Sequence, residues 1–170
     1  MKTKRARKTA RKSPAIAFVI EDEGWRKDPA TLRVIRRAAR RALDHAPRRA
    51  RGATILLTSD KRLRELNHQY RGKDKPTNVL SFTSDDPAHW GDVAIALGVV
   101  RREAREQRKT VPAHAAHLAA HGILHLKGYD HAKASDRASM ERIEILILST
   151  LGLPDPYAPR PYTRPAKAVN

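Results

Sequence analysis

The sequence of 170 residues contains no cysteine, and this absence limits both its covalent chemistry and its metal chemistry. A chain without thiols forms no disulfides, and it can hold a metal ion only through nitrogen and oxygen ligands. Such a composition is typical of proteins in a reducing compartment, which makes the cytoplasm the expected location. The length fits one domain with a hydrophobic core.

Long apolar segments are also missing from the sequence. No apolar run approaches the roughly 18 residues that a membrane-spanning helix needs. The basic N-terminus is not followed by an apolar segment, so it does not have the pattern of a secretory signal. We therefore expect a cytoplasmic protein with no membrane partner.

Acidic residues are scarce, since 18 Asp and Glu stand against 35 Lys and Arg and give a formal net charge of +17. A charge this large on a small chain favours a polyanionic partner, most often nucleic acid. The alternative is a solvated, arginine-rich surface that binds no such partner. Of the two interpretations, the charge favours nucleic acid.

Charge and proline content divide the chain into three parts. Residues 1–13 carry seven cations and no acid, and a segment of this composition cannot bury enough surface to fold. Residues 158–170 belong to a proline-rich end that predicts an irregular tail. Between the basic arm and this tail we expect one folded domain over 14–157.

Hydrophobic patterns predict four strands and five helices. The strands are expected at 15–22, 53–58, 78–82 and 92–97. The helices are expected at 28–46, 59–70, 98–108, 112–127 and 135–151. The expected N-caps are Asp28, Ser59 and, for the last helix, Ser135 or Asp136. Because strands come early and helices cluster late, we predict an α+β fold with a small mixed β-sheet of about four strands.

Three histidines occupy positions one, five and eleven of the segment HGILHLKGYDH, which begins at residue 121. His121 and His125 lie one turn apart on one face of the expected helix 112–127, with about 5–6 Å between their Cβ atoms. Gly128 can end this helix in a left-handed conformation, after which the chain can bring His131 back as a third ligand. Three imidazoles with an open fourth position are typical of catalytic zinc, although Ni²⁺, Co²⁺ and Cu²⁺ remain possible.

The alternative for this segment is a set of ordinary surface or core histidines, but their clustering and spacing favour a metal site. His114 and His117 precede the three on the same helix face, and we expect them to support the site through packing or hydrogen bonds. Asp130 directly precedes a ligand, and we expect it to orient His131 or to pack at the turn.

Zinc proteases of the pattern H-E-x-x-H-x-x-G-x-x-H share this spacing, but their second residue is a glutamate that acts as general base. Here that residue is Gly122. A protease must protonate an amine leaving group, whereas a phosphodiester mainly needs its negative charge neutralised. The missing glutamate and the basic composition therefore argue against a protease.

The segment YRGKDKPTN at residues 70–78 is a cationic loop between an expected helix and an expected strand. By itself it could be a solvated turn, but beside a metal site on a basic chain its cations favour phosphate binding. Arginine presents a planar fork to a phosphate, so we expect Arg71 to stabilise the negative charge that develops at phosphorus. Lys73 and Lys75 are expected to bind flanking phosphates.

HGILHLKGYDH, together with LNHQYRGKDKPTNVLSF at 66–82 and GDVAIA at 91–96, closely resembles the YbeY family of bacterial metal-dependent endoribonucleases. The resemblance covers about 53–157. It implies an α+β fold and one zinc ion held by His121, His125 and His131. It also implies that Arg71, the arginine of the YRGKD motif, is a functional residue. Many members of the family have aspartate at the position of Asn78.

The resemblance further implies single-strand-selective cleavage of RNA and a role in 3′-end maturation of small-subunit rRNA and in ribosome quality control. The partners that it implies are rRNA, the small ribosomal subunit and assembly factors. The resulting hypothesis is a zinc-dependent endoribonuclease in which metal-activated water attacks the phosphodiester while Arg71 stabilises the transition state. The alternative nucleophile is the RNA's own 2′-hydroxyl, with the metal only stabilising charge. The alternative is a non-catalytic RNA-binding factor of ribosome assembly in which the metal is structural.

Overall fold

The structure, a computed structural model, describes residues 15–45 and 51–158. The basic arm expected at 1–13 lies outside the described residues, and so does the expected tail apart from its first residue, Ala158. The described part contains almost all of the domain expected over 14–157.

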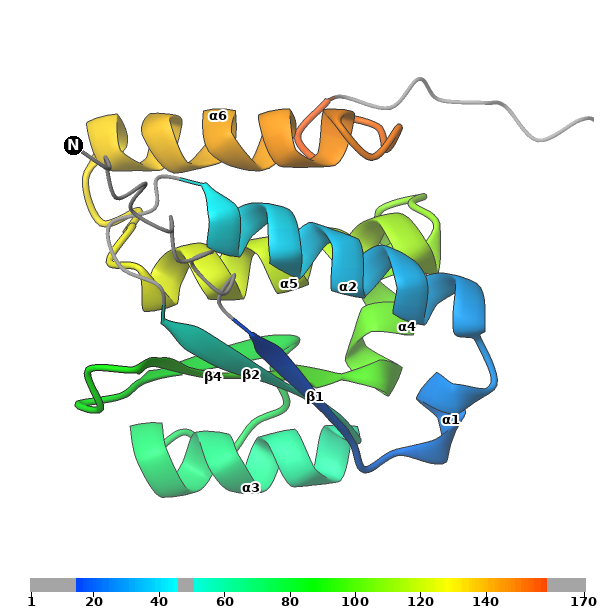
Figure 1. Cartoon of the computed structure of the whole chain (residues 1–170). Coiled ribbons are helices and arrows are strands. Elements are labelled where there is room, and N and C mark those ends of the chain that lie inside the picture. Colours follow the sequence, from blue (N-terminus) through cyan, green and yellow to red (C-terminus); the bar gives the residue numbers. More distant parts are fainter. Residues whose placement is uncertain (1–14, 46–50, 159–170) are drawn as a thin grey trace, which may run out of the picture.

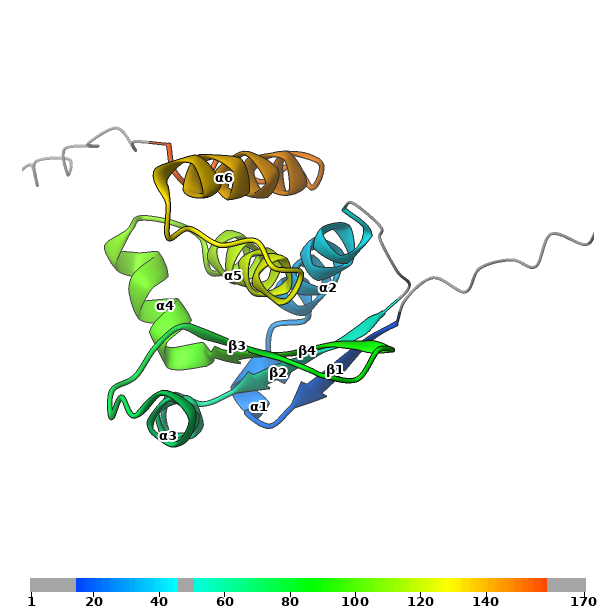
Figure 2. The same ribbon diagram turned by 90° about the vertical axis from the view of Figure 1, so that its left-hand side faces the viewer.

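Four strands form one mixed sheet in the order β1-β2-β4-β3 (Figures 1 and 2). They are β1 Ile16–Ile20, β2 Gly52–Thr58, β3 Val79–Thr83 and β4 His89–Ala96. The pairs β1–β2 and β2–β4 are parallel, whereas β3 is antiparallel to β4 and lies at an edge of the sheet. The predicted α+β fold with a four-stranded mixed sheet is therefore confirmed.

Helices cover both faces of this sheet. In the described residues they are α1 Glu23–Arg26, α2 Pro29–Asp44, α3 Asp60–Arg71, α4 Leu97–Glu106, α5 Val111–Leu126 and α6 Ala134–Ser149. Figures 1 and 2 show α2 and α5 against one face with α6 stacked on them, and α3 against the opposite face. None of the helices in the described ranges is long and apolar enough to cross a membrane.

The helix starts match the sequence expectations in two cases and differ in two others. Asp28 and Ser59 are N-caps, as expected, and accept hydrogen bonds from backbone amides of α2 and α3. The cap expected at Ser135 or Asp136 is wrong, because α6 already begins at Ala134 after Lys133 and has no side-chain cap. The single turn α1 was not predicted, because four residues are too few to show a helical period.

Each face of the sheet has its own apolar core. The larger core joins the sheet to α2, α5 and α6 and includes Ile55, Val93, Ile123 and Leu148. The smaller core joins the sheet to α3 and includes Leu63, Leu66, Leu80 and Val99. The two faces meet at the edge strand β3, where Leu80 belongs to the smaller core and Val79 packs against the larger one.

Candidate metal centre and its cavity

The last turns of α5 present two of the predicted ligands, and the chain after the helix returns the third. Gly128 follows α5 with a φ of 87°, so the expected left-handed residue is present where the helix ends. The ligand atoms of His121, His125 and His131 all lie within 4.8 Å of one another, and this group could hold a metal ion. The structure thus brings together all three histidines that the spacing singled out.

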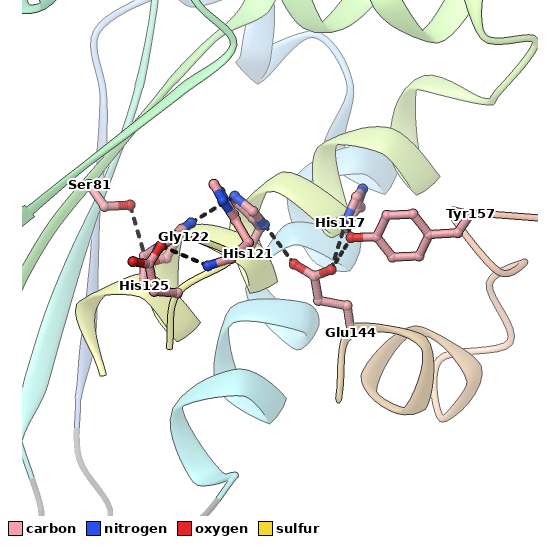
Figure 3. Close-up of polar contacts among 9 residues, drawn as sticks. Ser81, His117, His121, Gly122, His125, Glu144 and Tyr157 are labelled. Carbon is pink, nitrogen blue, oxygen red and sulfur yellow. Dashed lines mark hydrogen bonds and ion pairs between the residues drawn. The ribbon is translucent and has the colours of Figure 1, made fainter. Parts of the chain in front are cut away.

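A buried carboxylate from α6 orients the first of these histidines (Figure 3). Glu144 has no exposed surface, and its Oε1 accepts a hydrogen bond of 2.7 Å from Nδ1 of His121. That bond makes Nδ1 the donor nitrogen and leaves Nε2 of His121 as the acceptor, 3.1 Å from Nε2 of His125. Imidazole nitrogens that converge in this way form a donor set suited to a divalent transition metal, so the residues fit the expected ion.

Two further donors hold Glu144 in place. The hydroxyl of Tyr157, from the segment after α6, donates to Oε2 of Glu144, and Nε2 of His117 lies 3.3 Å from the same oxygen. Figure 3 shows this chain of contacts running from Tyr157 through Glu144 to His121. The expected supporting role of His117 thus has a physical basis, because His117 contacts the carboxylate that orients His121.

Electrostatics keep these groups in the forms that coordination requires. Burial by itself would raise the pKa of Glu144, but the hydrogen bonds from His117, His121 and Tyr157 outweigh it and lower that pKa to about 2. Burial, followed by the nearby imidazoles of His121 and His131, lowers the pKa of His125. The carboxylate therefore stays charged and the imidazole of His125 stays neutral at neutral pH.

A second group of possible ligands, His117, His121 and Glu144, also has its ligand atoms within 4.8 Å of one another. Both oxygens of Glu144 and Nε2 of His117 already take part in hydrogen bonds within this group and with Tyr157. A metal bound there would displace all of these bonds, whereas a metal among the three histidines would replace the contact between Nε2 of His121 and Nε2 of His125. The geometry therefore favours the three histidines as the metal ligands, with Glu144 behind them.

Gly122, which stands where zinc proteases have their glutamate, is required by packing. A Cβ atom at this position would lie 2.4 Å from Cγ1 of Val93 on β4, and the hydroxyl of Ser81 on β3 donates to the Gly122 carbonyl at 3.2 Å. The position after His121 therefore faces the sheet. A longer side chain here would enter the core and would not reach toward the metal.

The three histidines line a cavity of about 470 Å³. The other lining residues are Arg71, Asn78, Val79, Ser81, Thr83 and Asp130. Arg71 is the last residue of α3, which packs on the opposite face of the sheet from α5 (Figure 2), and it lines this cavity together with residues of the edge strand β3. The structure thus places the predicted arginine and the predicted metal ligands around one space.

The loop after Arg71 is exposed but held by its own hydrogen bonds. Gly72 is left-handed with a φ of 64°, and Nδ2 of Asn67 donates to the Lys75 carbonyl at 2.8 Å. Arg64 binds both carboxylate oxygens of Asp74, at 2.6 and 2.8 Å. The loop thus has a fixed shape, and its acid already has a cationic partner.

Lys73 and Lys75 are exposed in this loop, and they are not among the residues that line the cavity with Arg71. Asp130 lines the cavity, and its Oδ1 accepts a 2.7 Å hydrogen bond from the backbone amide of His131. That bond agrees with the turn-packing role expected for Asp130. Nε2 of His114 is hydrogen-bonded to Oε2 of Glu103 on α4 at 2.8 Å, and this hydrogen bond does not connect His114 to the predicted metal ligands.

Sequence reasoning missed several residues around the site. Glu103 accepts hydrogen bonds from Asn78 and His114, and neither partner has a sequence signal that points to it. Glu144 did have such a signal, because it is the one acid in the apolar run of residues 143–148, IEILIL. A charge in the apolar stripe of a helix is seldom buried without partners. Tyr157 lies in the proline-rich end and had no such signal.

Comparison with known proteins places the chain within one family along most of its length. The sequence model described as "Endoribonuclease YbeY" matches residues 20–152. A protein of that name from Bradyrhizobium diazoefficiens is 42% identical over 162 residues, which cover 88% of each chain. Another from Rhodopseudomonas palustris is 43% identical over 155 residues, covering 85% of this chain and 82% of the relative.

A solved structure also resembles the fold. The solution structure of TM1509 from Thermotoga maritima superimposes with a TM-score of 0.53. The match covers 85% of this chain and 99% of that one, at 23% sequence identity. At this identity the likeness concerns the fold alone.

Proposed function

The chain belongs to the endoribonuclease YbeY family and is therefore an enzyme that cleaves RNA, and we propose that it is zinc-dependent and selective for single strands. We further propose that it acts in the cytoplasm in 3′-end maturation of small-subunit rRNA and in ribosome quality control, together with ribosome assembly factors. The observation that carries the site assignment is the cavity that Arg71 shares with His121, His125 and His131.

The charge of the chain agrees with this substrate. The net charge of +17 suits a polyanion, and the cavity puts an arginine beside three histidines that could hold a metal ion. A phosphodiester needs charge neutralisation on its non-bridging oxygens during attack, and a cation beside a metal site can supply it. RNA cleavage is then compatible with Gly122 in place of the glutamate of zinc proteases, because the leaving group is an alkoxide oxygen and not an amine.

Each side chain has a separate task in the proposed mechanism. Zinc, when bound, supplies a Lewis acid and lowers the pKa of a water molecule. His121, His125 and His131 would hold that ion, and Glu144 fixes the ring of His121 so that Nε2 faces the other ligands. Arg71 binds the scissile phosphate through its planar fork and stabilises the charge that builds up there.

The two lysines of the loop act farther from the reacting phosphorus. Lys73 and Lys75 are exposed and outside the cavity, so they would contact phosphates that flank the scissile one. Such contacts position the strand and do not depend on base identity. We assign Lys73 and Lys75 to substrate binding and Arg71 to catalysis.

The test is turnover of a single-stranded oligoribonucleotide by the purified protein. Cleavage should disappear with a chelator and return with Zn²⁺, and the same sequence in a duplex should resist. His89→Ala is a matched control and should retain turnover, because the His89 side chain pairs with Asp92 and does not line the cavity. Tight RNA binding without turnover under any metal condition would instead support a non-catalytic assembly factor with a structural metal.

A further inference from the structure

An exposed aromatic ring lies directly beside the proposed catalytic arginine. Tyr70 precedes Arg71 in the last turn of α3, and 61% of its surface is exposed, the largest fraction among the exposed large hydrophobic residues of the described chain. All described residues from 68 to 76 are exposed as well. A ring that is this exposed contributes little to the hydrophobic core, so packing does not explain why an aromatic residue occupies this position.

The ring of Tyr70 is nevertheless held in place from behind. Its centroid lies 5.0 Å from that of Phe82 on β3, with 59° between the ring planes. Phe82 itself packs against the smaller core beneath α3. The phenol is therefore supported on one side and open on the other, which is the arrangement of a stacking platform.

The edge strand β3 connects this platform to the metal cavity. Side chains alternate along a strand, so Phe82 faces α3 while Ser81 and Thr83 line the cavity on the other face. Arg71 lines the same cavity and directly follows Tyr70 in the chain. A strand of RNA that leaves the cavity over this edge would meet the ring of Tyr70.

The surroundings of the ring suit a polyanion with unpaired bases. Arg71, Lys73 and Lys75 lie in the same exposed segment, and the nearest acid in the sequence, Asp74, is bound to Arg64. Sites that bind single strands without sequence preference combine a cationic track with aromatic rings on which bases stack. Both components are present within residues 70–75.

We propose that Tyr70, supported by Phe82, is a nucleobase subsite on which one unpaired base of the RNA stacks while Arg71 holds a neighbouring phosphate. This inference rests on the proposed function and adds a source of selectivity to it. A base within a duplex is stacked between its neighbours and cannot lie on the ring, whereas an unpaired base can. The subsite therefore favours single strands without reading their sequence.

The test measures RNA binding to chelated protein, in which cleavage does not consume the ligand. Tyr70→Ala should weaken binding of a fluorescent single-stranded oligoribonucleotide by about 5- to 10-fold, near the lower end of what base–aromatic stacking contributes. Tyr70→Phe should bind within about twofold of the unmodified protein, since the π-face remains. Val19→Ala is the matched control, because Val19 is also an exposed apolar residue but lies on the other edge strand.

Two further measurements separate stacking from a general loss of RNA affinity. Duplex RNA should bind all variants equally, and the salt dependence of single-strand binding should be the same for Tyr70→Ala and the unmodified protein, because no phosphate contact is lost. In addition, one abasic position in the oligonucleotide should reproduce the loss, and Tyr70→Ala should add nothing to it.

Three results would overturn the subsite. They are unchanged affinity of Tyr70→Ala for both single-stranded RNA and small ribosomal subunits, an equal loss for duplex RNA, or unchanged RNA affinity together with lost binding to purified small ribosomal subunits, which would make Tyr70 a protein contact. Failure of the proposed function gives a different pattern, in which the unmodified protein does not cleave although the effect of Tyr70 on binding remains.

Discussion

The histidine centre beneath α6 and the exposed segment 68–76, of which Arg71 lines the cavity, meet at one cavity but are built in opposite ways. In the first, a fully buried carboxylate holds His121, and Tyr157 and His117 in turn hold the carboxylate. In the second, residues 68–76 are all exposed. Metal coordination demands fixed directions for each lone pair, which burial provides, whereas phosphate binding needs charge that a passing strand can reach.

This contrast predicts that substitutions in the histidine centre, the buried half, change the metal content of the protein. Substitutions in the segment 68–76, the exposed half, should instead change RNA binding or cleavage. The largest effect is expected for His125→Ala. The purified protein should carry about one transition metal per chain, and this variant should lose most of it and lose cleavage by more than 100-fold, because two imidazoles hold the ion poorly. Metal analysis and single-turnover cleavage check both, and full retention of metal would refute the coordination.

Arg71→Lys tests whether the exposed half takes part in chemistry. Lysine keeps the charge but loses the fork, so turnover should fall by about 100-fold or more while RNA affinity changes only a few-fold. Metal content should stay at one per chain. If turnover is normal and only binding weakens, Arg71 positions phosphates and does not act in the transition state.

Glu144→Gln weakens the support behind the ligand without touching the metal directly. The amide can still pack, but it cannot accept two strong hydrogen bonds as an anion, so metal affinity should fall by about 10- to 100-fold. Competition with a chromogenic chelator measures this. Tyr157→Phe should give a smaller loss, and Arg71→Lys should give none, which separates the two halves of the site.

Gly122→Ala probes the packing that brings the ligands to the sheet. The added methyl group meets Val93, so the free energy of unfolding should fall by about 1–3 kcal/mol. The loss should be the same with and without chelator, as measured by urea unfolding. Combining it with Val93→Ala should recover part of the loss, and an additive double variant would show that the two side chains do not meet.

The smallest effect is expected for Arg64→Ala in the loop. The hydrogen bonds from Arg64 lower the pKa of Asp74, so any stabilisation from this pair is present at neutral pH and is lost as the pH falls through the lowered pKa. In the variant that pKa should return toward its ordinary value, which NMR titration can follow. RNA affinity should fall only slightly, because the unpaired carboxylate of Asp74 then offsets part of the positive charge of the neighbouring cations. A large loss of RNA affinity would be inconsistent with an ion pair that is exposed to solvent and therefore contributes little.

Local sequence rules predicted the elements of this fold well. Periodicity placed all four strands and five of the six described helices, and the caps Asp28 and Ser59 followed from residue type. The turn α1 and the start of α6 escaped prediction. The first is too short for a period, and at the second Lys133 precedes a helix that no side chain caps.

The sequence by itself predicted which side chains come together as candidate metal ligands, because the 3.6-residue period of a helix and a left-handed glycine fix where His121, His125 and His131 can point. Only the tertiary structure decided what surrounds that set. The contact of His121 with Glu144 spans 23 residues of sequence, and that of Ser81 with Gly122 spans 41. Such pairs depend on how helices pack on the sheet, which no local spacing encodes.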